Sequence, residues 1–462
     1  MNVWSSSEEM YAVLATLLQG PIHPEQDFVC HGARLADVYD MASCFYTAFS
    51  KTKDNISPVA LAAEDRAVIA AALLAALASG TVLALPHSFS KTALQQMQDA
   101  TGFTAAIVDR DVTQQRQVLP ENTQLISFEP GVEKSVLPVE ALIVDRELLT
   151  LFTGGSTGTP KIWSKSAKNI FGEALYMADL YQINNTDIIA ATVSPYHIYG
   201  LLFSVLIPLI CSARVLGETP SFPAEIVTLI KQESVSILVS VPAHYRVLKG
   251  RPLGTSVKQA FSSAGMLDEE DSLDFTRCNS IGVVEVYGST ETGGLATRNR
   301  AAEQKYFHPL KPVEWQIKDE RLYVRSPFLS LDLATNHDGF FLSGDRVQKN
   351  GDESFSLHGR ADAICKVGGI RVDLDEVRDL LQQQPNVKEC VVVPLLDKSG
   401  RGNRIAALLR GDAVDICALQ KNLSHLLEPA ALPKQIKVVS AIPITANGKY
   451  DREAITDFLS TP

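Results

Sequence analysis

Two patterns of hydrophobic residues alternate along the first third of the chain. Apolar residues at helical spacing give way to short apolar runs of strand length. Between Ile56 and Val144 we expect a helix at Ala60–Ala78, a strand at Thr81–Leu85, a helix at Lys91–Asp99 and a strand at Ala105–Val108. Strands separated by helices in this way predict parallel strands joined by helical crossovers. The broken, polar stretch from Pro120 to Pro138 is expected to form a loop.

The same alternation continues through the middle of the chain. Leu148–Phe152 and Asp187–Val193 are predicted strands, and Lys168–Leu180, with its apolar residues on one side, is a predicted helix. The pattern extends through Ile226–Gln232, Val235–Val241 and Val257–Ser262. A mixed α/β fold is therefore expected.

Composition sets the broad class of protein. At 462 residues the chain exceeds what one core usually supports, so at least two domains are expected. A hydrophobic share of 46% with 21% charged residues is typical of a soluble globular protein. The net charge of −11, from 42 basic and 53 acidic residues, argues against nonspecific binding of nucleic acid.

The cysteines and the apolar runs indicate in which cellular compartment the protein is expected. The seven cysteines are scattered without a CxxC pair or a His/Cys cluster, which indicates reduced thiols rather than disulfides or a zinc site. The first residues lack the basic region and apolar run of a signal peptide. The apolar runs Ala67–Pro86 and Tyr199–Cys211 are interpreted as buried core, because Ser79–Thr81 breaks the first and the second is too short to span a bilayer. A cytoplasmic protein without a membrane span is expected.

A glycine-rich loop follows the predicted strand Leu148–Phe152. It reads Thr-Gly-Gly-Ser-Thr-Gly-Thr-Pro-Lys from Thr153 to Lys161. Glycines let backbone N–H groups turn inward, and the hydroxyls and the lysine add donors and positive charge, a combination that suits polyphosphate oxygens. A flexible linker is the alternative, and the preceding strand argues against it. The P-loop of kinases and GTPases is excluded, because Pro160 precedes the lysine and Ile162 follows it.

This loop resembles the T-x-G-S/T-T-G-x-P-K signature of the adenylate-forming superfamily, which includes acyl- and aryl-CoA ligases, luciferases and peptide-synthetase adenylation domains. Gly154 stands where a serine is common. The resemblance implies that the loop binds the phosphates of ATP, with the cofactor-binding residues Thr153, Gly155, Ser156, Thr157, Gly158 and Lys161.

The segment Ser194–Gly200 resembles the P-x-x-H-I-Y segment of 4-coumarate:CoA ligase and related enzymes. There the histidine lies at the acyl pocket, which implies a catalytic role for His197. Amino-acid-activating domains place an aspartate in this segment to pair with the substrate ammonium, whereas this chain offers Tyr196 and Tyr199 and no acid. A carboxylate substrate without an α-amino group is therefore expected, with a lean towards an aryl acid.

Two further segments follow predicted strands. Ser263, Ala264 and Gly265 resemble the segment that borders adenine and the acyl group, although a simple turn explains them equally well. The run Val284–Gly293 contains the superfamily's Y-G-S-T-E signature. By resemblance, cofactor binding falls to Tyr287, which stacks on adenine, and to Gly288 and Ser289. Thr290 would bind the α-phosphate, and Glu291 would be the Mg²⁺ ligand; both are counted as catalytic.

The remaining matches lie towards the carboxyl end. Ser343-Gly344-Asp345 resembles the S/T-G-D motif, which implies that Asp345 binds the ribose with Arg360 as its partner. The run Gly359–Glu376 resembles the hinge segment of the superfamily. It implies Asp362 as the hinge, Lys366 as a nucleotide contact, and Gly368 and Gly369 as the loop that approaches the acceptor thiol. The last motif, P-x-T-x-x-G-K-x-x-R, implies that Lys449 is the catalytic lysine.

Taken together, the resemblance implies a large N-terminal domain (1–359) of stacked, mostly parallel β-sheets with helices and a small β-barrel-like part. A hinge (360–363) and a small, mobile α+β C-terminal domain (364–462) follow. The Arg298–Phe341 stretch departs from the common pattern, because Ser326–Ser330 stands where Gly-Tyr is frequent.

The implied activity is an ATP- and Mg²⁺-dependent activation of an aromatic or medium-chain carboxylic acid to an acyl-adenylate. The acyl group then passes to the phosphopantetheine thiol of CoA or of an acyl carrier protein. Lys398, Arg401 and Arg404 form a basic cluster that could meet either acceptor or could be a solvated turn. The alternatives are a stand-alone protein that loads only a carrier protein, and a nucleotide-binding protein without catalysis. Since binding alone does not require both Glu291 and Lys449, the enzyme is preferred.

Overall fold

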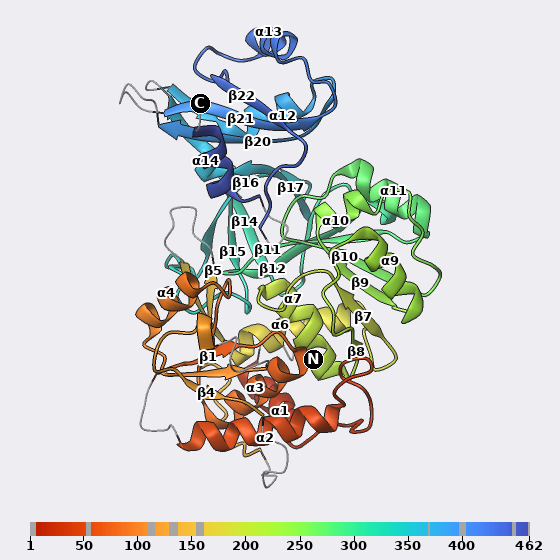
Figure 1. The fold of residues 1–462 in the computed structure, drawn as a ribbon, viewed down its shortest axis with the longest axis vertical. Coiled ribbons are helices and arrows are strands. Elements are labelled where there is room, and N and C mark those ends of the chain that lie inside the picture. The colour runs from red at the N-terminus through yellow and green to blue at the C-terminus, as the bar shows by residue number, and fades with distance from the viewer. Residues whose placement is uncertain are drawn as a thin grey trace. The chain divides into compact units, whose positions relative to one another are not determined.

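The computed structural model describes residues 6–51, 57–109, 116–128, 137–153, 161–367, 370–396, 403–445 and 450–460. Contacts between Cα atoms divide the chain into two compact units (Figure 1). Unit 1 comprises Met1–Glu314 and Arg325–Gly339, and unit 2 comprises Trp315–Val324 and Phe340–Pro462. The hinge predicted at 360–363 concerns motion, which these contacts do not measure, so it stays a prediction.

The first sheet of unit 1 carries the predicted crossovers. Its strands lie in the order β4 (Gln124–Ile126), β3 (Ala105–Val108), β1 (Val59–Ala62), β2 (Leu83–Leu85), β5 (Glu147–Thr153) and β6 (Lys161–Ser166). Neighbours are parallel except for the antiparallel pair β5 and β6. Helix α4 (Lys91–Thr101) packs on this sheet through Leu94 and Met97.

Two sequence-based expectations are wrong here. The apolar run Ala60–Ala78 is not one helix, because it begins as β1 and resumes as α3 (Arg66–Ser79). Asp65 separates the two, since its side chain accepts hydrogen bonds from the N–H groups of Ala67 and Val68 and so caps α3. The stretch expected to be a loop contains β4, which adds a parallel strand beside β3.

The second sheet of unit 1 is parallel in its centre. Its strands lie in the order β13 (His308–Pro309), β12 (Gly293–Asn299), β11 (Val283–Ser289), β10 (Gln259–Ser262), β9 (Ile237–Ser240), β7 (Ile188–Ala191) and β8 (Arg214–Val215). Only β12 pairs antiparallel, with β11 and β13. Helices α9 (Pro223–Gln232), α10 (Pro242–Val247) and α11 (Glu269–Asn279) lie beside these strands in Figure 1. They share a core with them, to which Ile226, Tyr245 and Phe275 contribute.

Helices between the sheets join them into one stack. Helix α6 (Ala167–Leu180) contacts β5 and β6 of the first sheet and β12 of the second. Helix α3 is buried along nearly its whole length and contacts α2 (Leu35–Lys51) and the π-helical turn Leu202–Leu206. That turn continues from α7 (Ile198–Leu201) into α8 (Ile207–Cys211), and α1 (Ser7–Leu18) contacts α6.

Unit 2 holds smaller sheets. One runs β14 (Glu314–Lys318), β15 (Arg321–Arg325), β16 (Phe341–Asn350) and β17 (Ser354–Arg360). A hairpin of β18 (Ile364–Val367) and β19 (Ile370–Asp373) follows the turn Ala361–Ala363. The last sheet pairs β20 (Val387–Leu396), β21 (Asn403–Gly411) and β22 (Gln435–Val439), with α12 (Leu374–Gln382), α13 (Ile416–Leu426) and α14 (Arg452–Ser460). Leu381 and Leu423 pack in the core of this part.

The predicted fold class is confirmed. Unit 1 stacks two mostly parallel sheets with helices between them, and unit 2 adds a small antiparallel sheet and an α+β part. Within the described part of the chain no helix is long and apolar enough to cross a membrane.

Candidate active site

The carboxyl ends of four neighbouring strands meet at one edge of the second sheet. The register places Ser262 of β10 beside Ser240 of β9 and Glu285 of β11, and the N–H of Thr192, just after β7, donates to the carbonyl of Val239. Strands β9 and β10 end beside each other at Ser240 and Ser262, and β11 continues to Ser289 before its hairpin. Ligands of open α/β sheets bind at such carboxyl ends. Three of the four segments that follow were singled out in the sequence.

The first segment carries His197, which immediately precedes α7. Its N–H donates to the carbonyl of Ser194, and its ring is half-buried. Its aromatic neighbours serve the core: the hydroxyl of Tyr196 donates to the carbonyl of Ala63 at 2.6 Å, and that of Tyr199 donates to the carbonyl of Ser240 at 3.3 Å. Both tyrosines are 9% exposed. The two rings therefore give less support to an aryl substrate than the sequence pattern did.

The second segment contributes a histidine that sequence reasoning missed. His244 lies in α10, just after β9, and its Nδ1 is 2.7 Å from the hydroxyl of Thr192. That hydroxyl is in turn 2.7 Å from the hydroxyl of Ser240. Burial lowers the pKa of His244 below its ordinary value. The signal that could have revealed it is its place three residues after the predicted strand Val235–Val241.

The third segment turns sharply away from β10. Ala264 has a φ of +69°, a left-handed conformation in which a residue with a side chain is uncommon. The Ser263 hydroxyl donates to the carbonyl of Val286 at 2.8 Å, which ties this turn to β11. A side chain at Gly265 would begin 3.7 Å from Pro242, so the turn also lies against α10.

The fourth segment is the hairpin between β11 and β12, with Thr290 and Glu291 at its tip. Gly288 is required there, because a Cβ would lie 2.2 Å from the carbonyl oxygen of Gly293. The hydroxyl of Thr292 accepts from the N–H of Ser289 at 3.0 Å and lies 2.9 Å from its hydroxyl. These bonds close the turn and present Thr290 and Glu291, both half-buried, beside one another.

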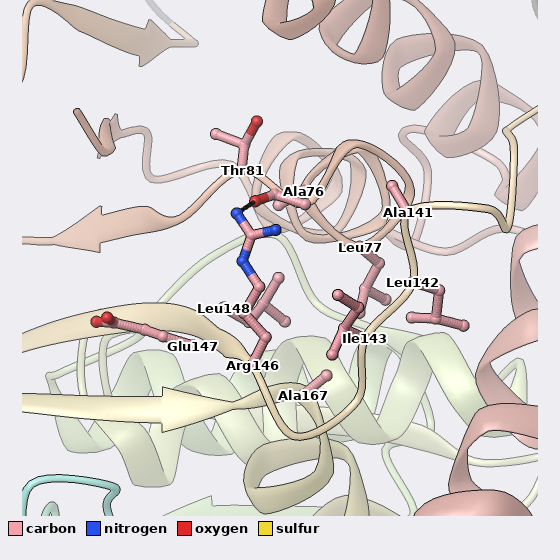
Figure 2. A pocket seen from close by; sticks show the side chains of 11 residues that line it. Ala76, Leu77, Thr81, Ala141, Leu142, Ile143, Arg146, Glu147, Leu148 and Ala167 are labelled. Carbon is pink, nitrogen blue, oxygen red and sulfur yellow. Dashed lines mark hydrogen bonds between the residues drawn. The ribbon is translucent and has the colours of Figure 1, made fainter. Parts of the chain in front are cut away.

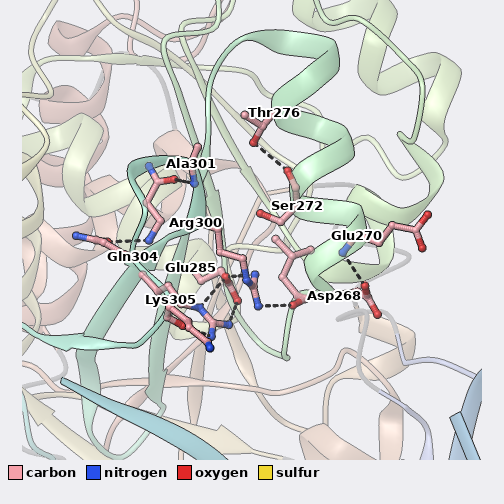
Figure 3. Close-up of polar contacts among 12 residues, drawn as sticks. Asp268, Glu270, Ser272, Thr276, Glu285, Arg300, Ala301, Gln304 and Lys305 are labelled. Carbon is pink, nitrogen blue, oxygen red and sulfur yellow. Dashed lines mark hydrogen bonds and ion pairs between the residues drawn. The ribbon is translucent and has the colours of Figure 1, made fainter. Parts of the chain in front are cut away.

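A buried charge cluster supports the strand that carries Tyr287 (Figure 3). The Glu285 carboxylate accepts from Nε of Arg298 at 3.0 Å and from Nη2 at 2.7 Å, and it also pairs with Arg300. Arg300 reaches the carbonyl of Leu267 at 3.3 Å, and burial lowers its pKa. The guanidinium of Arg298 lies 4.3 Å from the centre of the Phe307 ring, which lies 5.7 Å from that of Tyr287.

The predicted phosphate loop follows β5 and precedes β6. Thr153 and Lys161 are cross-strand partners, and the Thr153 hydroxyl is 3.4 Å from the Lys161 carbonyl. The predicted residues Gly155, Ser156, Thr157 and Gly158 lie outside the described residues. Four residues after Lys161, the ammonium of Lys165 is buried; burial lowers its pKa to about 8, and the carboxylates of Glu173 and Glu291 oppose that shift.

Unit 2 brings together its own predicted pair. Asp345 on β16 and Arg360 on β17 are cross-strand partners, with 3.7 Å between Oδ1 and Nη1. The N–H of Arg360 donates to the carboxylate of Asp375 at 2.8 Å. Asp362 lies in the turn before β18 and Lys366 on β18, but their side chains lie outside the described residues.

The predicted catalytic lysine, Lys449, lies outside the described residues, as do Gly368, Gly369, Lys398 and Arg401. The structure does describe the residues on either side of this lysine's segment. Ile444 and Tyr450 form an antiparallel bridge, and the N–H of Asp451 donates to the carbonyl of Pro443 at 3.0 Å. The Tyr450 hydroxyl donates to Glu389 at 2.8 Å, so the residue that follows Lys449 is tied to β20. In the basic cluster, Arg404 bonds the side chain of Gln435 at 2.8 Å.

A small cavity lies between α3 and α6 (Figure 2). Its volume is about 10 Å³, room for one water molecule at most. Arg146 lines it and donates to the carbonyl of Gly80. This cavity is too small to hold a substrate.

The donors at the Glu291 hairpin suit a magnesium ion that is shared with a phosphate. Mg²⁺ prefers oxygen ligands and is usually bound by one or two carboxylates together with substrate phosphates. In the described parts of the chain no group of three or more His, Cys, Asp or Glu side chains could hold a metal alone. The Glu291 carboxylate and the Thr290 hydroxyl fit the shared kind of site.

Comparisons with known proteins show what the chain as a whole is similar to. The chain is 26% identical over 395 residues to a dimodular nonribosomal peptide synthase of Bacillus subtilis (strain 168), covering 76% of this chain but 16% of that protein. It is 24% identical over 373 residues to an indoleacetate–CoA ligase of Aromatoleum aromaticum (strain DSM 19018 / LMG 30748 / EbN1), covering 72% of each. The ATP-bound structure of MatB from Rhodopseudomonas palustris superimposes with a TM-score of 0.80 at 17% identity, covering 98% of this chain and 99% of that one.

Two family descriptions match the chain itself. "AMP-binding enzyme" matches residues 37–327, and "AMP-binding enzyme C-terminal domain" matches residues 376–449. The first match covers well over half of the chain and includes the His197, Ser263 and Glu291 segments. The protein therefore belongs to the AMP-binding enzyme family.

Proposed function

We propose that the protein is an AMP-forming acid–thiol ligase that activates an aromatic or medium-chain carboxylic acid with ATP. The observation that carries the proposal is the meeting of the His197, Ser263–Gly265 and Tyr287–Glu291 segments at one strand edge. A nucleotide laid along this edge would have an aromatic ring, hydroxyls and a carboxylate in the order that adenine, α-phosphate and metal require.

The reaction follows from leaving-group chemistry. A carboxylate does not react with a thiol, because hydroxide is a poor leaving group. In the first step the substrate oxygen bonds to the α-phosphorus of ATP, and the bond to pyrophosphate breaks. In the second, the thiol sulfur bonds to the acyl carbon, AMP leaves, and the thiol proton passes to solvent.

The residues of this chain would act mainly by positioning and by stabilising negative charge. Tyr287 would hold adenine and Thr290 would bond the α-phosphate, while the Thr153–Lys161 loop would hold the other phosphates. Mg²⁺, held by Glu291, would neutralise charge that develops on the phosphate oxygens. His197 would lie at the acyl end, and Asp345 with Arg360 would bind the ribose. Charge-assisted hydrogen bonds of this kind contribute about 1.5–3 kcal/mol each.

In the second step Lys449 must leave the adenylate so that a thiol can approach it. We propose that the C-terminal domain (364–462) rotates about Asp362, which would bring Gly368 and Gly369 to the acceptor. The support for this rotation is the resemblance of Gly359–Glu376 to the hinge segment of the superfamily.

Acid-dependent exchange of labelled pyrophosphate into ATP tests the proposal. A panel of aryl, aryl-acetic and medium-chain acids should include one that supports exchange in the presence of Mg²⁺. If none of the acids supports exchange, although the protein is folded and binds ATP, a nucleotide-binding protein without catalysis is favoured. Competition between CoA and a holo-carrier protein for the acyl group then identifies the acceptor, and transfer to the carrier alone would favour a loading protein.

A further inference from the structure

Lys165 lies behind the Glu291 hairpin in the interior of unit 1. It is 1% exposed, and its Nζ donates to the carbonyl of Phe328 at 2.6 Å and to the carbonyl of Glu291 at 3.2 Å. Side chains alternate along a strand, so Lys165 shares a face of β6 with Lys161, at the end of the phosphate loop. One strand therefore links the predicted phosphate site to the backbone of the predicted metal ligand.

The Glu291 carbonyl has a second donor, from the segment Ser326–Leu333, which we call the edge segment. The N–H of Ser330 donates to it at 2.8 Å. The edge segment is itself fixed to β6, because the N–H of Leu331 donates to the carbonyl of Ser164 at 2.9 Å. The Glu291 peptide is thus held from two sides, by a side chain and by a backbone group.

Glu173, on α6, holds the other arm of the hairpin. Its Oε1 accepts from the N–H of Gly294 at 2.7 Å, and it is 5% exposed. Gly293 has a φ of +66°, and a Cβ there would lie 2.6 Å from Oε2 of Glu173. The carboxylate of Glu173 also attracts the ammonium of Lys165. Two buried side chains of opposite charge therefore hold both ends of the turn that carries Glu291.

We propose that Lys165 and Glu173 are positioning residues that hold the Glu291 carboxylate at a fixed place relative to β6, the strand that carries Lys161, for a divalent cation bound with ATP. This inference rests on the proposed function of Glu291. Burying an ammonium and a carboxylate is unfavourable unless both are well bonded, and an apolar pair can fill such a site without loss of stability. Groups behind a ligand commonly set its orientation and its metal affinity.

The test uses the double variant Lys165→Met/Glu173→Gln of the full chain. It leaves no unpaired buried charge, and the glutamine can still accept from Gly294. Mn²⁺ serves as the probe, and its binding is followed by electron paramagnetic resonance with a non-hydrolysable ATP analogue. Hydrogen–deuterium exchange at the Thr290–Thr292 amides is measured without ligand. The matched control is Lys168→Met, since Lys168 bonds Ser7 at 2.9 Å and Asp145 at 3.3 Å, away from the hairpin.

We expect the double variant to fold, to bind Mn²⁺ about 10- to 100-fold more weakly, and to exchange these amides faster. Lys165→Arg keeps the charge and the donors, so it should bind Mn²⁺ more tightly than the double variant and more weakly than the wild type. The Lys168→Met control should match the wild type. Ser330→Pro removes the other N–H donor to the Glu291 carbonyl and should also weaken Mn²⁺ binding. This variant provides the test if the double variant does not fold.

A folded double variant with wild-type Mn²⁺ affinity and exchange would overturn the proposal, as would a Ser330→Pro protein that binds Mn²⁺ normally. Neither measurement needs turnover. A wild-type protein that released no pyrophosphate with any acid would refute the proposed function, while the Mn²⁺ comparison would still decide the role of Lys165.

Discussion

Neutralising Glu285 should destabilise unit 1 and weaken the binding of ATP together. Glu285 is 4% exposed and pairs with both Arg298 and Arg300, so Glu285→Gln keeps the shape but leaves the buried guanidinium of Arg298 and the half-buried one of Arg300 without a counter-charge. Removing one partner of a buried ion pair lowers the free energy of unfolding by about 3–5 kcal/mol. For a unit of this size that corresponds to a fall of roughly 6–10 °C in the thermal midpoint.

Replacing Arg298 should lower the free energy of unfolding more than replacing Arg300. Arg300→Met leaves the two-point pairing of Glu285 with Arg298 intact, so we expect a loss of about 1–2 kcal/mol. Arg298→Met removes both of its bonds to Glu285 and the stack on Phe307, so a loss of about 3 kcal/mol or more is expected. The Phe307 ring lies against Tyr287, and the KM for ATP should therefore rise most in the Glu285 and Arg298 variants.

Thermal unfolding and pyrophosphate exchange measure the two effects. The control is Lys249→Ala, which breaks the exposed pair with Glu270 and should leave the thermal midpoint close to that of the wild type. The reasoning fails if Glu285→Gln unfolds within 2 °C of the wild type, or if Arg300→Met is the more damaging of the two arginine changes.

Three further predictions concern other parts of the chain. Lys449→Ala should slow adenylate formation by about 10²–10³-fold and largely spare thioester formation from supplied acyl-adenylate; equal loss of both half-reactions would contradict domain alternation. Neutralising Lys398, Arg401 and Arg404 together should raise the KM for the thiol acceptor by roughly 10-fold and leave that for ATP unchanged, whereas an unchanged acceptor KM would make the cluster a solvated turn. Because the pKa of His244 is lowered in the folded state, the unfolded chain takes up that proton first, and stability should be lost as the pH falls below 6.5. The thermal midpoint of His244→Gln should then fall less than that of the wild type between about pH 7.5 and about pH 5.5, and parallel curves would exclude the effect.

Local signals accounted for much of the fold and for the order of the site segments. Short apolar runs identified strands such as Val257–Ser262, which ends one residue before the Ser263 turn. The Y-G-S-T-E run was expected to follow a strand, and it forms the end of β11 and the hairpin to β12. Periodicity failed where composition was uniform, since the alanine-rich run from Ala60 has no pattern that separates β1 from α3.

The parts of the site that could not be predicted depend on contacts distant in sequence. Nothing near Lys165 indicates that its ammonium is buried, because its partners Phe328 and Glu291 lie more than a hundred residues away. His244 becomes notable only when β7 and β9 are paired and Thr192 reaches it. Conversely, the rings beside His197 suggested a pocket lining, and only the three-dimensional packing assigns the hydroxyls of these tyrosines to backbone carbonyls.

Strand β6 is the last strand of its sheet, and a bare strand at that position could recruit a strand from another molecule. The edge segment occupies it instead: Leu331 bonds the carbonyl of Ser164, and the Asp332 carboxylate accepts from the N–H of Ser164 at 2.7 Å. A strand edge that is covered by another segment and carries a charged side chain is less available for intermolecular β-pairing. The edge segment therefore covers β6 at Ser164, and removing it should expose the outer edge of this strand to other molecules, which light scattering of the shortened protein would detect as aggregation.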